Sequence, residues 1–395
     1  MRNWPERLSA WLESRQAQMV DFVCDLVRLP SENPPGVHYA ECIARIEREL
    51  HVLGLCANRT AEGLAVESRY GRPGGPPLYL SGHYDVVPAQ SRSQFEPFVR
   101  DGRLFGRGTS DMKGGIAAML YGMAALPATA ADLRGEVVLR CVPDEETGGS
   151  RGSALLARTA GIDPNAVGML TAEPTGGVVW NASRGAITWR VTATGREAHV
   201  GLHYEGVNAV DAIIDLAGEL RGLRAEVANR RTRHVVAGER ARESVLLVGG
   251  RIEGGSNFNV VPGHCTITLD RRTNPEEPIE EERARLHECI ARVRARGVPL
   301  EIEVIQEGEA SDTSADAPLS RALAAAVEQV EGRSPAFELC PGLLETRFYS
   351  ARGIPALAYG PGDLGVSHGP DEHIELARMF DAAAVYATTI VSLLS

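Results

Sequence analysis

Short apolar runs alternate with helical patterns along the first 180 residues. After a predicted amphipathic helix near 5–28, apolar residues recur every three or four positions over 39–53, and 114–126 form an almost wholly apolar helical segment. Runs with the length of buried strands lie near 63–69, 77–82, 136–142 and 166–171. Strands that alternate with helices form a mostly parallel sheet with helices on its faces. The pattern predicts a doubly wound α/β domain.

The pattern changes near residue 183. Residues 186–192 alternate like a half-exposed strand, 207–220 have a helical pattern, and further strands are expected at 244–248 and 265–270. The final part returns to alternation, with a helix at 318–331, a strand at 354–359 and a closing helix near 375–393. We therefore predict a first domain built from 1–182 and 309–395, with an α+β domain, 183–308, inserted into it.

Composition narrows the function classes. A chain of 395 residues with 44% hydrophobic residues suggests about two domains. The 41 basic and 52 acidic residues give a net charge of -11, which argues against nucleic acid or anionic lipid as a partner. Seven scattered cysteines with no C-x-x-C spacing favour a reducing, cytoplasmic compartment. The N-terminus lacks a signal-peptide core, and we expect no membrane association.

Acidic and histidine residues gather where the strand-like runs end. They are His83 and Asp85, Asp111, Glu145 and Glu146, Glu173, and His368. Parallel sheets bind ligands at the carboxyl ends of their strands, so we expect these residues to converge on one site.

Each of these residues has an ordinary alternative when it is taken alone. His83 and Asp85 would suit a cap and a turn, and Asp111 would suit a helix cap. Together they favour metal chemistry, because Asp85 can support an imidazole ligand and a carboxylate such as Asp111 can bridge two cations. Beside metals, one of the adjacent Glu145 and Glu146 can be a ligand while the other is a general base. A set without cysteine suits catalytic zinc, cobalt or manganese.

The same segments carry a family resemblance. In order along nearly the whole chain they are SGHYDVVP, GRGTSDMKGG, PDEETGG, TAEPT, GREAHVG, NFNVVPG, DRRTNP and SHGPDEHI. With them the chain resembles the M20 metallopeptidases and deacylases, which include acetylornithine deacetylase, succinyl-diaminopimelate desuccinylase, aminoacylase and glutamate carboxypeptidase. The resemblance implies a zinc-peptidase-like mixed sheet in the catalytic domain and a lid or dimerisation role for the inserted domain.

The resemblance also implies roles for residues. His83, Asp111 and Glu173 would hold one divalent ion, Asp111, Glu146 and His368 would hold a second, Glu145 would be the general base, and Asp85 would orient His83. His199, in GREAH, would stabilise the oxyanion, and Asn259 and Arg272 would bind substrate. Two alternatives stay open: His199 as an exposed loop histidine and Arg272 as a surface ion-pair partner. Glu345 stands where the family often has Asp, which leaves the substrate open.

The two-metal pattern and the family resemblance together imply one expected activity. We expect a di-metal hydrolase that cleaves the amide bond of an N-acyl amino acid, as a deacetylase or desuccinylase does, with a metal-bridging water and a glutamate base. The alternatives are a metallo-carboxypeptidase or dipeptidase with the same centre and, with less support, a non-catalytic dimeric scaffold. The expected partners are a small N-acyl amino acid or short peptide and a second copy of the chain, joined through the lid domain.

Overall fold

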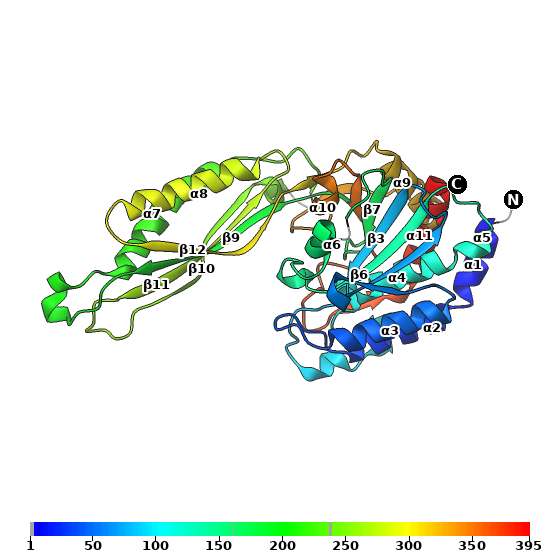
Figure 1. Cartoon of the computed structure of the whole chain (residues 1–395), viewed down its shortest axis with the longest axis horizontal. Helices are drawn as coiled ribbons and strands as arrows, with labels where there is room; N and C mark the ends of the chain where they lie inside the picture. Colours follow the sequence, from blue (N-terminus) through cyan, green and yellow to red (C-terminus); the bar gives the residue numbers. More distant parts are fainter. Residues whose placement is uncertain (1–3, 160, 237–238) are drawn as a thin grey trace. The chain divides into compact units, whose positions relative to one another are not determined.

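A computed structural model of the chain describes residues 4–159, 161–236 and 239–395, and it divides into two compact units (Figure 1). Unit 1 comprises Met1–Asn181, Asp312–Glu338 and Phe348–Ser395, and unit 2 comprises Ala182–Ser311 and Leu339–Arg347. The short segment Leu339–Arg347 therefore groups with unit 2, whereas the sequence pattern assigned it to the domain that begins and ends the chain.

The main sheet is mixed, with nine strands in the order β1-β2-β6-β3-β7-β15-β8-β13, and with β14 paired to β8. The strands are β1 (Asn58–Thr60), β2 (Ala65–Gly71), β3 (Pro77–His83), β6 (Glu136–Val142), β7 (Gly168–Thr171), β8 (Val179–Ser183), β13 (Ser311–Asp312), β14 (Phe337–Cys340) and β15 (Ala356–Ala358). β3 pairs in parallel with β6 and β7, and β15 pairs in parallel with β7, whereas β2 is antiparallel to β6. The predicted mixed α/β class is confirmed.

Both faces of this sheet are covered. Leu78 and Leu80 of β3 pack into a core with the helices α4 (Gly114–Ala124) and α11 (Leu376–Leu394). Tyr79, between them, points into a second core on the other face. This alternation follows from the two-residue period of a strand, and it is what makes the unit doubly wound.

The remaining helices of unit 1 are α1 (Trp4–Glu13), α2 (Gln16–Arg28), α3 (Tyr39–Val52), α5 (Leu126–Thr129), α6 (Ser153–Thr159), α9 (Pro318–Glu331) and α10 (Arg347–Ser350), the last of which begins at the boundary with unit 2. The single helix predicted near 5–28 is wrong, because the chain breaks between α1 and α2. Ser14 Oγ donates to the carbonyl oxygen of Trp11 at this break. Such side-chain bonds compete with the helical backbone ladder.

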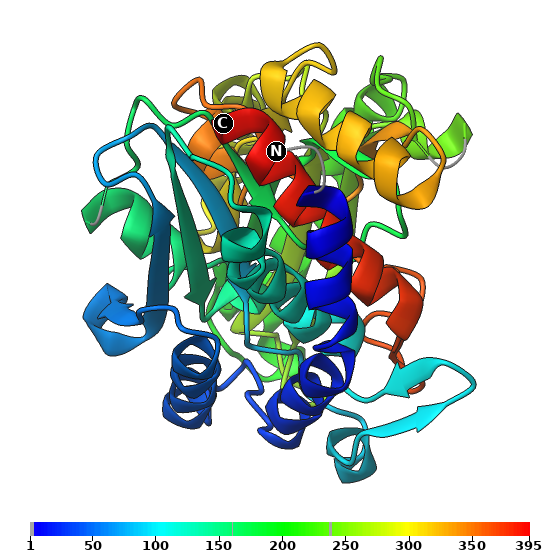
Figure 2. The same ribbon diagram turned by 90° about the vertical axis from the view of Figure 1, so that its right-hand side faces the viewer.

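Helix α11 lies at the centre of the helical layer. It contacts α1, α4 and α9, and Figure 2 shows α1 and α11 side by side. The contact with α4 is close, because a Cβ at Gly122 would lie 2.7 Å from the carbonyl oxygen of Ala383. Within the described residues α11 is the one helix long and apolar enough to cross a membrane. Its apolar side chains, including Met379, Tyr386 and Ile390, instead fill the core of unit 1.

A small three-stranded sheet connects two loops of unit 1. It has the order β16-β5-β4, with β4 (Phe98–Arg100), β5 (Arg103–Phe105) and β16 (His373–Glu375). β5 leads into the loop that contains Asp111, and β16 follows the loop that contains His368. The antiparallel pairing of β5 with β16 therefore brings these two loops together, although they are more than 250 positions apart.

Unit 2 is an antiparallel sheet covered on one face by two helices. Its order is β10-β11-β9-β12, with β9 (Gly185–Thr194), β10 (Val245–Gly254), β11 (His264–Thr273) and β12 (Leu300–Gly308). The helices α7 (Ala209–Val227) and α8 (Ile279–Arg294) pack on the face that carries Trp189, Ile267 and Leu269. Every second residue of β11 faces away from them and is partly exposed. This is the α+β architecture predicted for the inserted domain.

Candidate metal centre

Three neighbouring strands of unit 1 carry candidate residues at the same edge of the sheet. His83 is the last residue of β3, Glu173 follows β7 by two positions, and Glu145 and Glu146 begin a short 3-10 helix after β6. Because β6, β3 and β7 are parallel and adjacent, their carboxyl ends meet. Asp111 and His368 come to this edge from the two loops joined by β5 and β16.

The candidates form two overlapping clusters. In the first, His83, Asp111 and Glu173 are all buried, and one possible ligand atom of each lies within 4.8 Å of those of the others. In the second, Asp111, Glu146 and His368 meet the same distance limit. The structure thus brings together all five residues that the sequence suggested as ligands.

Asp111 presents a different oxygen to each cluster. Its Oδ1 lies 3.2 Å from His83 Nε2, and its Oδ2 lies 3.2 Å from His368 Nε2. His368 Nε2 is also 3.4 Å from Glu146 Oε2. A carboxylate that directs its two oxygens to two separate groups of donors has the arrangement needed to bridge two cations.

Electrostatics favour positive charge at both clusters. Burial alone would lower the pKa of His83, but its hydrogen bonds to Asp111 and Asp85 raise that pKa well above the ordinary value. Hydrogen bonds to Asp111 and Glu146 raise the pKa of His368 to about 10. Burial would raise the pKa of Asp111, but the two histidines outweigh it and lower that pKa. Divalent cations would supply the same positive charge while leaving both imidazoles neutral, so the donor set fits metal ions.

Asp85 supports the site in a way that differs from the expected one. His83 Nδ1 is 3.0 Å from the backbone carbonyl oxygen of Asp85, and 3.5 Å from its carboxylate. The carboxylate, which is fully buried, accepts the backbone N–H groups of Glu145 and Glu146, each at 3.2 Å. Asp85 therefore orients His83 mainly through its main chain, and its side chain holds the 145–146 turn against the end of β3.

Comparison with known proteins identifies the family. The sequence profile described as Peptidase family M20/M25/M40 matches residues 79–392. The chain belongs to this family. The chain is therefore an M20 enzyme, a metal-dependent hydrolase of the peptidase and amidohydrolase type.

Two relatives in sequence are named succinyl-diaminopimelate desuccinylases, one of them as probable. A succinyl-diaminopimelate desuccinylase of Gluconacetobacter diazotrophicus is 30% identical over 387 residues, which cover 94% of this chain and 95% of the relative. A probable succinyl-diaminopimelate desuccinylase of Staphylococcus epidermidis is 26% identical over 391 residues, with 93% and 95% coverage.

Solved structures share the fold at lower identity. A dipeptidase from Saccharomyces cerevisiae has a TM-score of 0.78 at 16% identity, covering 100% of this chain and 99% of that one. An M20 metallo-carboxypeptidase from Sulfolobus solfataricus has a TM-score of 0.77 at 17% identity, covering 95% and 98%. A Bacillus subtilis protein described as a dinuclear metal binding peptidase of the M20 family has a TM-score of 0.72 at 15% identity, covering 97% and 99%.

The remaining candidates of this M20 chain lie in unit 2. His199 is exposed, and its Nδ1 accepts the N–H of Gly201 at 3.1 Å, so the proton of a neutral ring is on Nε2. The next residue, Val200, donates its N–H to the carbonyl oxygen of Asn259 at 2.9 Å. His199 and Asn259 are therefore neighbours on adjacent loops of unit 2.

Arg272 lies at the other end of the unit 2 sheet. It pairs with Ala186 of β9, whereas His264, at the start of β11, pairs with Thr194. The chain runs on from Thr194 to His199, so His199 lies beyond one end of these strands and Arg272 lies near the other. Arg272 Nε is 2.9 Å from Asp270 Oδ1, which is the ion pair that the sequence left open as an alternative.

Several supporting residues of the M20 centre were not singled out from the sequence. Asn33 Nδ2 donates to the carboxylates of Asp85 and Asp144. Asp144 accepts four hydrogen bonds, and together these outweigh burial and lower its pKa. Arg107 and Glu372 form a buried ion pair beneath the two loops. Asp144, Arg107 and Glu372 lie inside the quoted motifs, which was the available signal, whereas Asn33 lies outside all of them. A motif also does not say which atoms meet.

Proposed function

We propose that this M20 enzyme hydrolyses the amide bond of an N-acyl amino acid and uses two divalent cations per chain. His83, Asp111 and Glu173 would hold one cation, and Asp111, Glu146 and His368 would hold the other. The observation that carries this proposal is the bridging disposition of Asp111, which turns one carboxylate oxygen toward each cluster.

The donor chemistry supports zinc, with cobalt or manganese as substitutes. Two imidazole nitrogens and three carboxylates make a mixed nitrogen and oxygen set without thiolate, which is typical of catalytic sites. Cations bound there would supply Lewis acidity toward the amide carbonyl and would make water a better acid.

Glu145 is the proposed general base. Its backbone N–H donates to the Asp85 carboxylate, and the residue is half-buried. Glu146 accepts the N–H of Val87 at 3.2 Å and approaches His368, so the two adjacent glutamates have different surroundings. Glu145 takes a proton from the attacking water and then delivers it to the leaving amine nitrogen.

Unit 2 would complete the site as a lid domain that spans 183–308. His199 Nε2 carries the proton suited to stabilise the oxyanion. Arg272 would grip the free carboxylate of the substrate in a bidentate manner, and Asn259 would hydrogen-bond to the substrate. The Asp270 ion pair would then serve to hold Arg272 in place until substrate binds.

The separation of Arg272 and His199 supports a homodimer through unit 2. A small substrate held by Arg272 of one chain can reach His199 only if a second copy presents it. Exposed apolar side chains around His199 and Asn259 support a contact surface there, namely Val200, Leu202, Tyr204 and Phe258, the last of them 94% exposed.

All seven cysteines lie in described residues and are free thiols, which supports a reducing, cytoplasmic environment.

A substrate panel tests the proposal. The metal-loaded enzyme would be assayed with N-succinyl, N-acetyl and N-formyl amino acids and with dipeptides, and the Glu145→Gln variant would control for metal-dependent background. We expect hydrolysis of N-acyl amino acids, with N-succinyl substrates favoured by the names of the relatives. Cleavage of dipeptides alone would replace this activity with the dipeptidase or carboxypeptidase alternative. Absence of hydrolysis with every substrate would support the scaffold alternative.

A further inference from the structure

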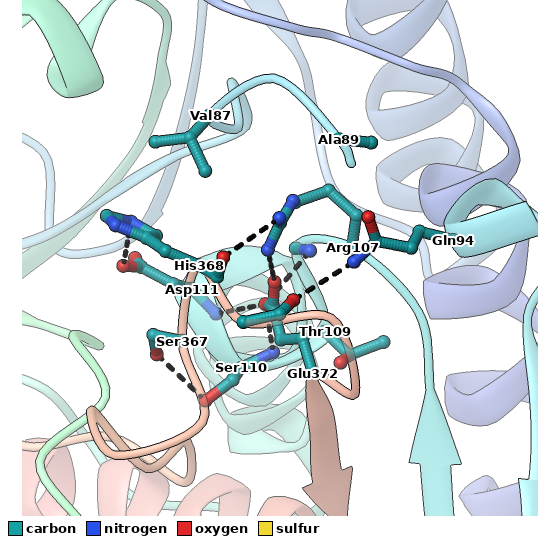
Figure 3. Close-up of polar contacts among 12 residues, drawn as sticks. Val87, Ala89, Gln94, Arg107, Thr109, Ser110, Asp111, Ser367, His368 and Glu372 are labelled. Atoms are coloured by element: carbon teal, nitrogen blue, oxygen red, sulfur yellow. Dashed lines mark hydrogen bonds and ion pairs between the residues drawn. The ribbon is translucent and has the colours of Figure 1, made fainter. Parts of the chain in front are cut away.

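A buried ion pair connects the two loops that bring Asp111 and His368 to the sheet edge. Arg107 and Glu372 are 1% and 2% exposed, and Arg107 Nη1 lies 2.5 Å from Glu372 Oε2 (Figure 3). Arg107 belongs to the loop after β5, and Glu372 directly precedes β16. The pair therefore joins the same two loops that the β5 and β16 pairing brings together.

The second oxygen of Glu372 organises the backbone of the Asp111 loop. Glu372 Oε1 accepts the N–H groups of Gly108 at 2.9 Å, Ser110 at 3.1 Å and Asp111 at 3.1 Å. Hydrogen bonds to an ionised carboxylate are stronger than those between neutral groups. Glu372 therefore holds the main chain of Asp111 directly (Figure 3).

Arg107 makes the corresponding contact to the other loop. Its Nη2 donates to the carbonyl oxygen of His368 at 3.1 Å. One ion pair thus touches the peptide groups of both Asp111 and His368. These are the two members of the second cluster that loops supply, whereas Glu146 comes from the turn after β6.

Neutral contacts reinforce the same connection. Ser367 Oγ lies 3.2 Å from Ser110 Oγ, and Gln94 Nε2 donates to the carbonyl oxygens of Gly369 and Pro370. A buried ion pair is often no more stabilising than well-packed apolar residues, so stability alone does not account for a pair with this set of contacts. Its contacts to two ligand residues indicate a role in geometry.

We propose that Arg107 and Glu372 are positioning residues that set the spacing between Asp111 and His368 and thereby control the affinity of the second cluster for its cation. This inference rests on the proposed function, since it requires that both clusters bind divalent ions. Arg107 contacts His368 directly and reaches Asp111 only through Glu372, so its loss should act mainly on the second ion. Glu372 also holds Asp111, which both clusters share, so its loss affects the second ion most and the first ion less.

Metal titration of the metal-free protein tests this without an activity assay. Co²⁺ would be added to wild type, Arg107→Lys and Glu372→Gln, and binding would be followed by visible absorption and by equilibrium dialysis with elemental analysis. Arg107→Lys keeps the charge but loses the guanidinium group, whose two terminal nitrogens donate to Glu372 and to the carbonyl oxygen of His368. We expect the first ion to bind Arg107→Lys as it binds wild type, and the second to bind about 10–100-fold more weakly, the usual effect of losing a supporting residue at a metal site.

A matched control separates positioning from general stability. Arg140 and Glu67 form another buried ion pair of unit 1, with Nε and Oε2 3.0 Å apart, and join β6 to β2. Glu67→Gln should lower the melting temperature of the metal-free protein while leaving both Co²⁺ affinities unchanged. If Glu372→Gln does not fold, Arg107→Lys carries the test.

The outcomes are distinct. Weakening of the second ion alone in Arg107→Lys supports the proposal. An unchanged second affinity in that variant, or equal weakening of both ions, overturns it, and the proposed function survives if wild type binds two ions and hydrolyses substrate. Failure of wild type to bind a second ion would instead refute the two-cation function on which the proposal rests.

Discussion

His199 should act on the substrate bound by a partner chain. Arg272 lies eight positions after His264 along β11, which corresponds to about 26 Å at ~3.3 Å per strand residue. An N-acyl amino acid is no longer than about three extended residues, or roughly 10 Å. One copy of unit 2 cannot place both Arg272 and His199 on such a substrate, so a shared role of the two residues requires a second copy.

Mixed variants measure this directly. His199→Ala should retain normal metal content and lose about 10²–10³ in kcat, because an oxyanion donor acts mainly in the transition state. When His199→Ala chains are mixed with Glu145→Ala chains, half of the randomly exchanged dimers are hybrids, and one of the two sites in each hybrid is intact. Activity should therefore recover to about a quarter of the wild-type value for a symmetric dimer.

The assay needs proof that subunits exchange. Each variant would carry a different affinity tag, and hybrids would be isolated by sequential purification before kcat is measured. Each variant alone serves as the inactive control. If purified hybrids are no more active than the parents, the assignment of His199 and Arg272 to one substrate across two chains is refuted.

Four further predictions concern single side chains. Asp111→Ala should lose both metal ions by elemental analysis, since its two oxygens face the two clusters, and retention of one full ion with activity would contradict the bridging role. Glu145→Gln should keep its metal and lose about 10²–10⁴ in kcat, whereas Glu146→Gln should weaken one metal, and the reverse order would refute the assignment. Arg272→Lys should raise KM more than it lowers kcat, and equal cleavage of substrates with amidated carboxylates would exclude this role. Asp144→Asn should lower the free energy of unfolding by about 1–3 kcal/mol in urea at neutral pH, because its amide would face hydrogen-bond donors. The lowered pKa of Asp144 means that its carboxylate stabilises the fold above about pH 4, so the difference between variant and wild type should shrink below that pH. A difference that does not change with pH would contradict this role.

The sequence contained enough information to bring the candidate ligands together. His83 ends, and Glu146 and Glu173 follow, strands that are mostly apolar on both faces, and such strands are parallel and adjacent in a doubly wound sheet. Their carboxyl ends must then share one edge. The mixed α/β class and the helical closing segment were predictable for the same reason, namely the length and period of the apolar runs.

Other features depend on contacts between distant segments. The strands β4, β5 and β16 have three residues each, too few to show a period, so the small sheet that joins the Asp111 and His368 loops was not predicted. The partner of Glu372 could not be read from its motif, because it depends on that sheet. Likewise, α8 and β12 of unit 2 were not predicted, and α8 has many charged residues that obscure its apolar side.

The discontinuity of unit 1 has a consequence for its synthesis. Helix α4, buried along its whole length, is covered by α11, which ends at the next to last residue of the chain. During translation the 251 residues from 125 to 375 are made before α11 begins, so the apolar surface of α4 lacks this partner in the meantime. Most of unit 2 is one continuous segment that can fold in the meantime. The nascent chain should thus depend on chaperone protection of its first third, and removal of α11 should expose an aggregation-prone surface on α4.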